Sequence, residues 1–290
     1  METACDYALE KRLRALSPDL HKRFADTVFA LQHILSNYKL IFPNYTDHSE
    51  LHSLTVINFC NQIIGDQLDM MNADEIYCLL VGCYFHDTGM GISKKDYAEF
   101  VKSLDLGTYF DTHDPMDARR TIRDFHNEFS GLFISKYADL FDIPSQAHLR
   151  AIIQISRGHR KTNLKDTSQY PIALEMPNGN TVCLPYLSAL IRLADEIDIT
   201  AARNSHLLFD IPTVVSTPQD MEFIKHEAVK EMIAEKDRFV VVYHTDMPSV
   251  EQALNMLLDK MQQTLDVCRA ATNGRTKYTI TQKGIVGHKV

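Results

Sequence analysis

The sequence predicts a mainly α fold with a small α+β unit at its C-terminal end. Up to about residue 204, apolar residues recur at spacings of three and four, the period of one helix face. From about residue 205, the chain changes to short runs rich in β-branched and aromatic residues, which are typical of strands. We therefore expect a helical domain over residues 1–204. We expect an α+β domain over residues 205–290, which packs on the first domain or regulates it.

Successive amphipathic segments make up the predicted helical domain. One of them opens with Asn72 followed three residues later by Glu75, the pattern of a capping box. A polar stretch at 160–181 contains Asn178-Gly179, which favours a small hairpin. The segments with helical periodicity are 20–38, 51–68, 72–85, 120–137, 147–156 and 184–199.

The C-terminal unit alternates between strand-like and helix-like segments. Its predicted strands are 206–211, 238–244 and 277–281, and its predicted helices are 221–236 and 249–271. The second of these helices has Ser249 and Gln252 placed for a capping box. This unit is a candidate interface for a homo-oligomer or a partner protein.

The composition excludes several classes of protein. A net charge of −8 argues against a broad basic face for duplex nucleic acid or anionic lipid, so a phosphate-bearing substrate must meet local positive charge or a metal. The six cysteines contain no C-x-x-C pair and are predicted to be buried thiols in a reducing cytosol. No apolar run approaches the roughly 20 residues that cross a bilayer, and the charged N-terminal segment is not a signal peptide. We expect a cytoplasmic protein with no membrane partner.

The doublet His86-Asp87 lies at the end of a strongly apolar helix. The apolar stripe of this helix runs through Ile76, Leu80 and Cys83, and the next position on the stripe is Asp87. A carboxylate on a core-facing stripe costs free energy unless it is paired or bound to metal. An isolated doublet is also typical of a helix C-terminus with a solvated aspartate, so other polar residues must decide between the two interpretations.

Several more polar residues stand at core-like positions in the predicted helices. Each alone is more typical of a structural role, such as a core histidine with one hydrogen bond. Together, imidazoles and carboxylates in one helical domain are the ligand set of a hard-to-borderline divalent metal site. They are His48 and His52 in one helix, His126 in a second, His159 after the end of a third, and Asp195 and Asp198 in a fourth.

Three motifs in order carry a family resemblance. The segments "HSELHSLTV", "GCYFHDTGMG" and "LIRLADEID" together resemble the HD superfamily of metal-dependent phosphohydrolases. The resemblance covers roughly residues 40–204 and implies an HD-type helical bundle with a His…His-Asp…Asp metal set. The chain is also similar to the HD-type effector domains associated with bacterial conflict systems, in which an "FPxYTxH" entry and an "R-x-x-H" helix recur.

The resemblance implies His52, His86, Asp87 and Asp195 as metal ligands, with Asp198 as the less favoured substitute for Asp195. It implies one or two divalent ions. With no cysteine placed to enforce zinc, the expected metal is Mn, Fe, Mg, Co, Ni or Zn. Those ions would be bound within the helical domain.

The resemblance also implies roles for the remaining histidines. His126 and His159 correspond to the extra histidines of two-metal members, in which Asp87 bridges the ions. In single-metal members, the counterpart of His126 instead handles the proton or the leaving phosphate. His48 stands where the cyclic-nucleotide phosphodiesterases have a proton-donating histidine.

The sequence departs from two HD subclasses. No His-Asp-Gly-Tyr-Pro signature follows the doublet, and Met90 stands where phosphodiesterases repeat a histidine. A second doublet, His113-Asp114, has no apolar stripe and is predicted to play no metal role. The other histidines are predicted to be structural or surface residues without carboxylate partners, namely His21, His33, His148, His206, His226, His244 and His288.

The predicted reaction is hydrolysis of a phosphate bond in a small nucleotide, either a nucleoside phosphate or a dNTP, by metal-activated water. Asp87 would orient the water, and His126 or His48 would protonate the leaving oxygen. The candidates for phosphate binding are Arg123, Arg157, Arg160 and Lys161. The alternatives are a phosphodiesterase for a cyclic or oligonucleotide signal and a non-catalytic nucleotide-binding sensor.

Overall fold

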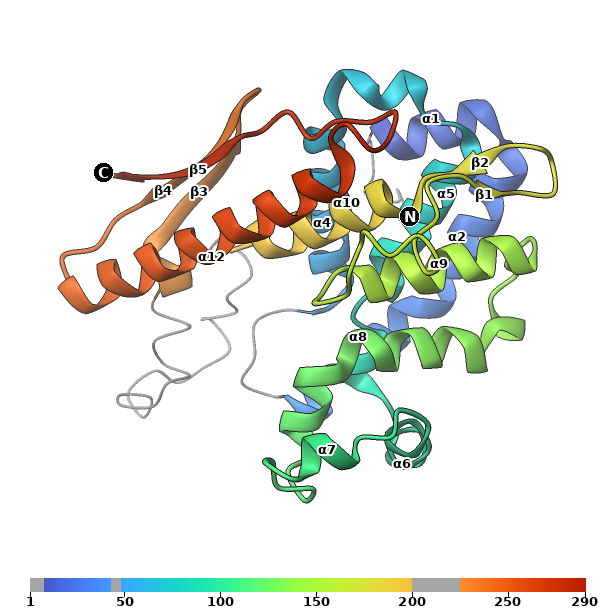
Figure 1. Cartoon of the computed structure of the whole chain (residues 1–290), viewed down its shortest axis with the longest axis horizontal. Coiled ribbons are helices and arrows are strands. Elements are labelled where there is room, and N and C mark those ends of the chain that lie inside the picture. Colours follow the sequence, from blue (N-terminus) through green and yellow to red (C-terminus); the bar gives the residue numbers. More distant parts are fainter. Residues whose placement is uncertain (1–7, 43–47, 200–224) are drawn as a thin grey trace.

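The computed structural model describes residues 8–42, 48–199 and 225–290, which form a mainly helical body with two small sheets (Figure 1). The predicted mainly α fold with a small C-terminal strand unit is confirmed. The α-helices are α1 (Ala8–Leu16), α2 (Pro18–Leu35), α3 (Tyr38–Ile41), α4 (Glu50–Ile64), α5 (Ala73–Phe85), α6 (Lys94–Ser103), α7 (Gly107–Phe110), α8 (Ala118–Lys136), α9 (Gln146–Gly158), α10 (Leu184–Ile197) and α12 (Pro248–Thr272). The strands are β1 (Leu174–Glu175), β2 (Thr181–Val182), β3 (Val229–Ala234), β4 (Arg238–Tyr243) and β5 (Gly284–Lys289).

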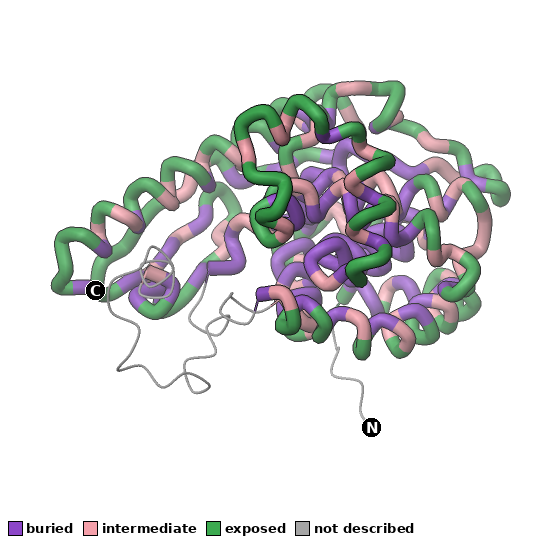
Figure 2. Tube along the Cα trace, turned by 90° about the horizontal axis from the view of Figure 1, so that it is seen from below, coloured by how far each residue is buried: buried purple, intermediate pink, exposed green. Residues whose placement is uncertain are grey.

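Helix α5 lies at the centre of the body. Its residues from Asp74 to Phe85 are all buried, as expected for a helix that is apolar on every side. The predicted capping box begins it, because Asn72 and Glu75 each accept a hydrogen bond from the other's main-chain N–H. Helices α1, α2, α4, α9 and α10 pack around α5. The C-terminal end of α5 therefore lies inside the body, and His86 and Asp87, which follow it, are buried. Figure 2 shows that the buried residues are concentrated in the helical body.

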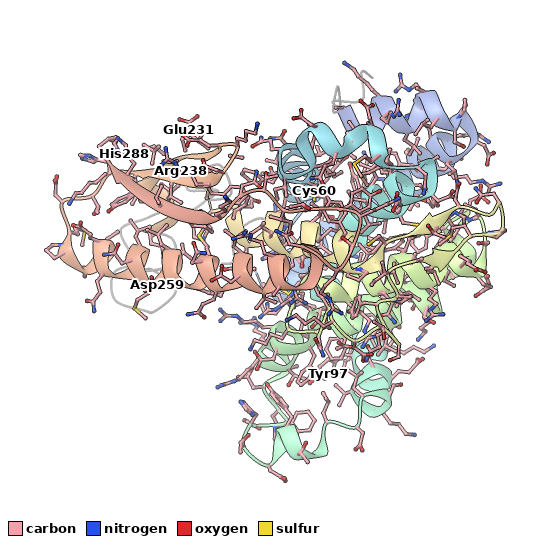
Figure 3. The ribbon with its side chains drawn as sticks, turned by 45° about the horizontal axis from the view of Figure 1, so that its top comes forward. Cys60, Tyr97, Glu231, Arg238, Asp259 and His288 are labelled. Carbon is pink, nitrogen blue, oxygen red and sulfur yellow. The ribbon has the colours of Figure 1, made fainter. Side chains whose placement is uncertain are left out.

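The C-terminal unit is a three-stranded sheet packed beside α12. The strand order is β3-β4-β5, with β3 antiparallel and β5 parallel to β4. Alternate residues of β4, including Phe239 and Val241, are buried, and β5 packs on α12. Figure 3 labels Glu231, Arg238 and His288 on the strands and Asp259 on α12.

The predicted helix over 221–236 is wrong from Val229 onwards, because residues 229–234 form β3. Most of these residues are good helix formers, but helix propensity is a weak preference that tertiary pairing overrides. The β4 segment beside them is strongly β-forming, and pairing with it buries Val229 and Met232. The predicted strand 206–211 lies outside the described residues.

The predicted strand over 277–281 is also wrong, and the third strand is β5 instead. The segment is held by the helical body rather than by a ladder. The ring of Tyr278 stacks on Tyr186 with centroids 4.2 Å apart, and its hydroxyl donates to Glu75 Oε2 at 2.6 Å. The N–H of Thr279 donates to Gln67 Oε1 at 2.8 Å.

Other predicted features stand as follows. The helix over 249–271 and the hairpin are confirmed, with Gly179 at φ +85° in the turn. The predicted capping box of Ser249 and Gln252 is wrong, because the helix begins at Pro248 and its N-cap Met247 makes no side-chain capping hydrogen bond. Buried apolar residues of the helical body and the C-terminal unit belong to one hydrophobic cluster, and the division at residue 204 stays a prediction. The cysteines that the structure describes are buried and unbridged. Within the described ranges, no helix is long and apolar enough to cross a membrane.

Candidate metal centre

Five helices bring polar side chains to one place inside the body. The side chains are His48 and His52 at the start of α4, His86 and Asp87 after α5, His126 in α8, His159 after α9, and Asp195 in the last turn of α10. Helix α9 packs on α5, α8 and α10, and α10 also packs on α4 (Figure 1). The residues that the sequence nominated as metal ligands are therefore all neighbours in space.

Asp87 lies in the middle, and its two carboxylate oxygens face different histidines. Oδ2 lies 3.4 Å from His52 Nε2 and 3.2 Å from His86 Nε2. Oδ1 lies 3.5 Å from His126 Nε2 and 3.8 Å from His159 Nε2. The carboxylate thus separates two sides of the centre. The α4 side comprises His52, His86 and Asp195, and the α8 side comprises His126 and His159.

The outer nitrogen, Nδ1, of each of these four rings faces a hydrogen-bond acceptor. The acceptors are Cys83 O at 2.7 Å from His86, Arg123 O at 2.9 Å from His126, Ser156 O at 2.5 Å from His159, and Asp198 Oδ2 at 2.7 Å from His52. In a neutral ring the proton therefore lies on Nδ1, and the lone pair of Nε2 points into the centre.

Inside the centre, these lone pairs face one another. His52 Nε2 lies 3.2 Å from His86 Nε2, and His126 Nε2 lies 3.0 Å from His159 Nε2. Two acceptors at this separation repel unless a proton or a cation lies near both. Metal-ligating histidines nearly always donate their other N–H to a carbonyl or carboxylate, as all four do here.

The donor set therefore fits a divalent metal. Three overlapping groups among the described residues have ligand atoms within 4.8 Å of one another. They are His48 with His52 and Asp87, His52 with His86 and Asp195, and Asp87 with His126 and His159. Imidazole and carboxylate ligands suit first-row divalent ions.

Electrostatics keep the central carboxylate charged. Burial alone would raise the pKa of Asp87. The surrounding rings of His86, His48 and His52 outweigh burial and hold that pKa well below its ordinary value. The side chain is only 4% exposed. An ionised carboxylate in the core attracts a cation strongly.

The histidines of the α8 side are neutral near pH 7. Burial lowers the pKa of His126 to about 4, and the positive charge of Arg160 adds to this effect. Burial and the neighbouring rings of His126 and His86 hold the pKa of His159 well below its ordinary value. Neutral imidazole is the form that binds metal.

Asp195 and Asp198 contact opposite nitrogens of the same histidine. Asp195 Oδ1 lies 3.2 Å from His52 Nε2, on the inner side, whereas Asp198 Oδ2 lies 2.7 Å from His52 Nδ1. Asp198 is the C-cap of α10 and has left the helical conformation. Asp195 therefore lies among the candidate ligands, and Asp198 orients His52 from behind.

His48 and Asp195 form the edge of the centre. Their side chains are 15% and 24% exposed, whereas the other members of the cluster are 6% exposed or less. His48 Nδ1 contacts Asp87 Oδ2 at 2.7 Å, and its ring packs edge-on against Tyr38. Solvent therefore meets the centre on the side of these two residues.

The basic residues nominated for phosphate binding have different surroundings. Arg157 is engaged by Glu128, with its Nε and Nη2 each 2.8 Å from Oε2. Arg160 is half-buried and close enough to His126 to lower the pKa of that ring. Arg123 and Lys161 are exposed.

Two of the histidines predicted to lack carboxylate partners have one. His21 Nε2 lies 2.8 Å from Glu10 Oε1, and His148 Nε2 lies 2.8 Å from Asp74 Oδ1. The prediction failed because both acids lie far from their histidine in the sequence or on another helix.

We call Asp74 and its hydrogen-bond partners the Asp74 cluster. The partners are His148, Asn178 and Asn180, with Ser145 behind His148.

The second doublet lies apart from the centre. The His113 ring stacks on Tyr109 with centroids 4.1 Å apart, and its Nδ1 lies 3.0 Å from Tyr109 O. Asp114 is exposed and accepts from the N–H of Met116. Neither residue belongs to a candidate metal group among the described residues.

Comparison with known proteins adds one match. The model of the family described as HD-CE matches residues 42–267, which is most of the chain and includes every residue of the centre. The searches of curated proteins and of solved structures found no match.

Proposed function

Because the chain belongs to the HD-CE family, whose HD-type domain indicates a metal-dependent phosphohydrolase in general, we propose that it hydrolyses a phosphate bond of a nucleotide. The substrate would be a nucleoside phosphate or a deoxynucleoside triphosphate. One observation carries the proposal: imidazole lone pairs face one another around a buried, ionised carboxylate. This arrangement supports a cation-binding centre rather than a set of core histidines.

Six side chains would hold one or two divalent ions. They are His52, His86 and Asp195 on the α4 side, His126 and His159 on the α8 side, and Asp87 between them. A bound divalent ion supplies Lewis acidity, which withdraws charge from phosphoryl oxygens and acidifies water. The protein's own part is to orient these ligands, through hydrogen bonds to each Nδ1, and to exclude bulk water from all but one edge.

We propose that His48, rather than His126, donates a proton to the leaving oxygen. His48 lies at the exposed edge, where it exchanges protons with water, and its Nδ1 lies 2.7 Å from Asp87 Oδ2. His126, with a pKa of about 4, is neutral at pH 7 and points its lone pair inwards. A protonated ring at the edge suits a general acid, and a neutral inward ring suits a ligand.

Phosphate groups of the substrate would meet Arg160 first. Arg160 is the nominated cation whose charge acts on His126, and a guanidinium binds phosphate oxygens in a bidentate manner. Arg123 and Lys161 stand farther out at exposed positions. Arg157 would have to leave Glu128 to bind a substrate, so its first role is to link α8 with α9.

The test is turnover of a nucleotide panel by protein loaded with a single metal at a time. The panel should include nucleoside monophosphates, deoxynucleoside triphosphates, cyclic nucleotides and short oligonucleotides. We expect phosphate release by the wild type and none by a variant carrying His86→Ala with Asp87→Ala. His48→Ala should keep its metal but lose about 10²–10⁴-fold in kcat, the usual contribution of a general acid.

Two outcomes would replace this proposal. Turnover confined to the cyclic nucleotides or oligonucleotides would identify a phosphodiesterase. Metal and nucleotide binding without turnover of any compound would identify a sensor.

A further inference from the structure

The turn after Asp87 packs against α8 backbone to backbone. This turn is the 3-10 helix η2 (Thr88–Gly91). A Cβ atom added at Gly89 would overlap the carbonyl oxygen of His126 and lie 2.7 Å from the main-chain nitrogen of Ser130. Real Cβ atoms essentially never come within 3.0 Å of such neighbours, and here the neighbour is helix backbone, which cannot yield cheaply. Only glycine permits this approach.

One buried hydroxyl then fixes the turn to the helix. Ser130 Oγ donates to His86 O at 2.6 Å and accepts from the N–H of Gly89 at 2.9 Å. Ser130 is fully buried. The residues before and after Asp87 are thus both tied to the turn of α8 that begins at His126.

The two sides of the centre depend differently on this contact. The separation of 3.5 Å between Asp87 Oδ1 and His126 Nε2 depends on how closely α8 approaches η2. The separation of 3.4 Å between Asp87 Oδ2 and His52 Nε2 depends on α4, which does not take part in the contact. A disturbance at Gly89 therefore acts on the α8 side first.

We propose that Gly89 and Ser130 are positioning residues that keep His126 within metal-binding distance of Asp87. They decide whether the group of Asp87, His126 and His159 takes an ion. Because this inference rests on the proposed metal centre, its test measures metal binding directly and does not depend on turnover.

The test is calorimetric titration of metal-free protein with Mn²⁺, with bound metal counted by elemental analysis. The variants are Gly89→Ala and Ser130→Ala, and His126→Ala provides the reference for a lost ligand on the α8 side. Gly131→Ala is the matched glycine control, because its Cβ would meet the side chains of Arg157 and Ile153 and no main-chain atom. Ser188→Ala is the matched serine control, because its buried hydroxyl has no hydrogen-bond partner among the described residues.

We expect Gly89→Ala to reproduce the binding defect of His126→Ala, while the α4 side still takes an ion. Ser130→Ala should weaken the same binding step by about 10–100-fold, the usual effect of removing a group that orients a ligand. Both controls should bind Mn²⁺ as the wild type does. If Gly89→Ala does not fold, as judged by circular dichroism, Ser130→Ala decides the matter alone.

Wild-type Mn²⁺ binding by Ser130→Ala, or by a folded Gly89→Ala, would overturn the inference. So would loss of all Mn²⁺ by either variant, since the defect would then not be confined to the α8 side. Failure of the proposed centre has a separate signature, which is absence of Mn²⁺ binding by the wild type or an unaltered titration for His126→Ala.

Discussion

The described part of the chain contains two buried clusters of histidine and carboxylate that differ in how their polar atoms are paired. In the Asp74 cluster, Asp74 Oδ1 lies 2.8 Å from His148 Nε2, and Oδ2 accepts from the side-chain amides of Asn178 and Asn180 at 2.9 and 2.6 Å. Ser145 Oγ lies 2.8 Å from the other nitrogen of His148. In this cluster, both oxygens of Asp74 and both ring nitrogens of His148 have a hydrogen-bond partner.

The metal centre has the opposite pairing on its inner side. The rings of His52, His86, His126 and His159 use Nδ1 to donate outwards, and their Nε2 acceptors then face other acceptors and the oxygens of Asp87. Both clusters place a buried histidine beside a buried aspartate, so neither burial nor this pair of residue types separates a ligand set from a structural one. The discriminating feature is an excess of acceptors over donors, which a cation would balance.

Asp87→Ala should have the largest effect, because it should abolish the metal binding that distinguishes the metal centre from the Asp74 cluster. Because this carboxylate faces histidines on both sides of the centre, we expect bound metal to fall to background. The unfolding midpoint of the variant should then no longer rise with added Mn²⁺, since a ligand stabilises only a protein that binds it. Elemental analysis and thermal unfolding measure both effects. Wild-type metal content in this variant would contradict the assignment of Asp87.

His148→Ala should give the reverse result in the Asp74 cluster. A hydrogen bond to a buried charged group contributes roughly 1.5–3 kcal/mol, and because the amides of Asn178 and Asn180 remain, we expect a loss of about 2 kcal/mol. Urea unfolding of the metal-free protein measures it. The variant should still bind Mn²⁺ as the wild type does, and a loss of metal here would erase the distinction between the clusters. His148→Gln, which keeps a donor, is the matched control.

The free energy of unfolding should depend on pH through the Asp74 carboxylate, which its hydrogen-bond partners hold ionised. Burial alone would raise the pKa of Asp74, but hydrogen bonds from His148, Asn180 and Asn178 lower it from its ordinary value of 3.8 to about 2. A depressed pKa stabilises the folded state above the unfolded value, so the contribution is present above about pH 4 and is lost as the pH falls towards 2. It amounts to about 2 kcal/mol.

Asp74→Asn removes this titration. The stability difference between the wild type and Asp74→Asn, followed by urea unfolding, should therefore shrink by about 2 kcal/mol between pH 4.5 and pH 2. Carboxylates elsewhere titrate in both proteins and cancel in the difference. A difference that stays constant with pH would show that Asp74 is not held ionised by its cluster.

His113→Ala should have the smallest effect. The second doublet contains the same two residue types as His86-Asp87, but it lies at the surface and belongs to no cluster. We expect a change in the free energy of unfolding within about 0.5 kcal/mol, as is usual for surface substitutions, and no change in bound metal. Metal loss in this variant would mean that the residue type alone, and not its surroundings, determines binding.

Some candidate ligands could be predicted from the sequence because they interrupt apolar helical segments, and the family resemblance implied the rest. Asp87 follows Cys83 on the apolar stripe of α5, and Asp195 interrupts an otherwise apolar helix. The division of the centre into two sides was implied by the resemblance alone and could not be derived from local patterns, because it depends on how α8 approaches the turn after Asp87. The opposite roles of Asp195 and Asp198 depend likewise on where α10 ends.

Partners distant in the sequence also escaped prediction. His148 and Asp74 are 74 positions apart, and no local pattern links them. Residues 229–234 have helix-forming composition and become a strand only because β4 lies beside them. In both cases, tertiary contacts decide what local propensity leaves open.

The hydrogen bond between Tyr278 and Glu75 has a consequence for how the protein is made. Glu75 caps the helix at whose far end His86 and Asp87 lie, yet the hydroxyl that satisfies its buried carboxylate comes from a residue 203 positions later. During synthesis on the ribosome, the nascent chain therefore lacks this hydrogen bond of its core helix until residue 278 has emerged. Final consolidation of the core around α5 then waits for a residue translated long after the helix itself.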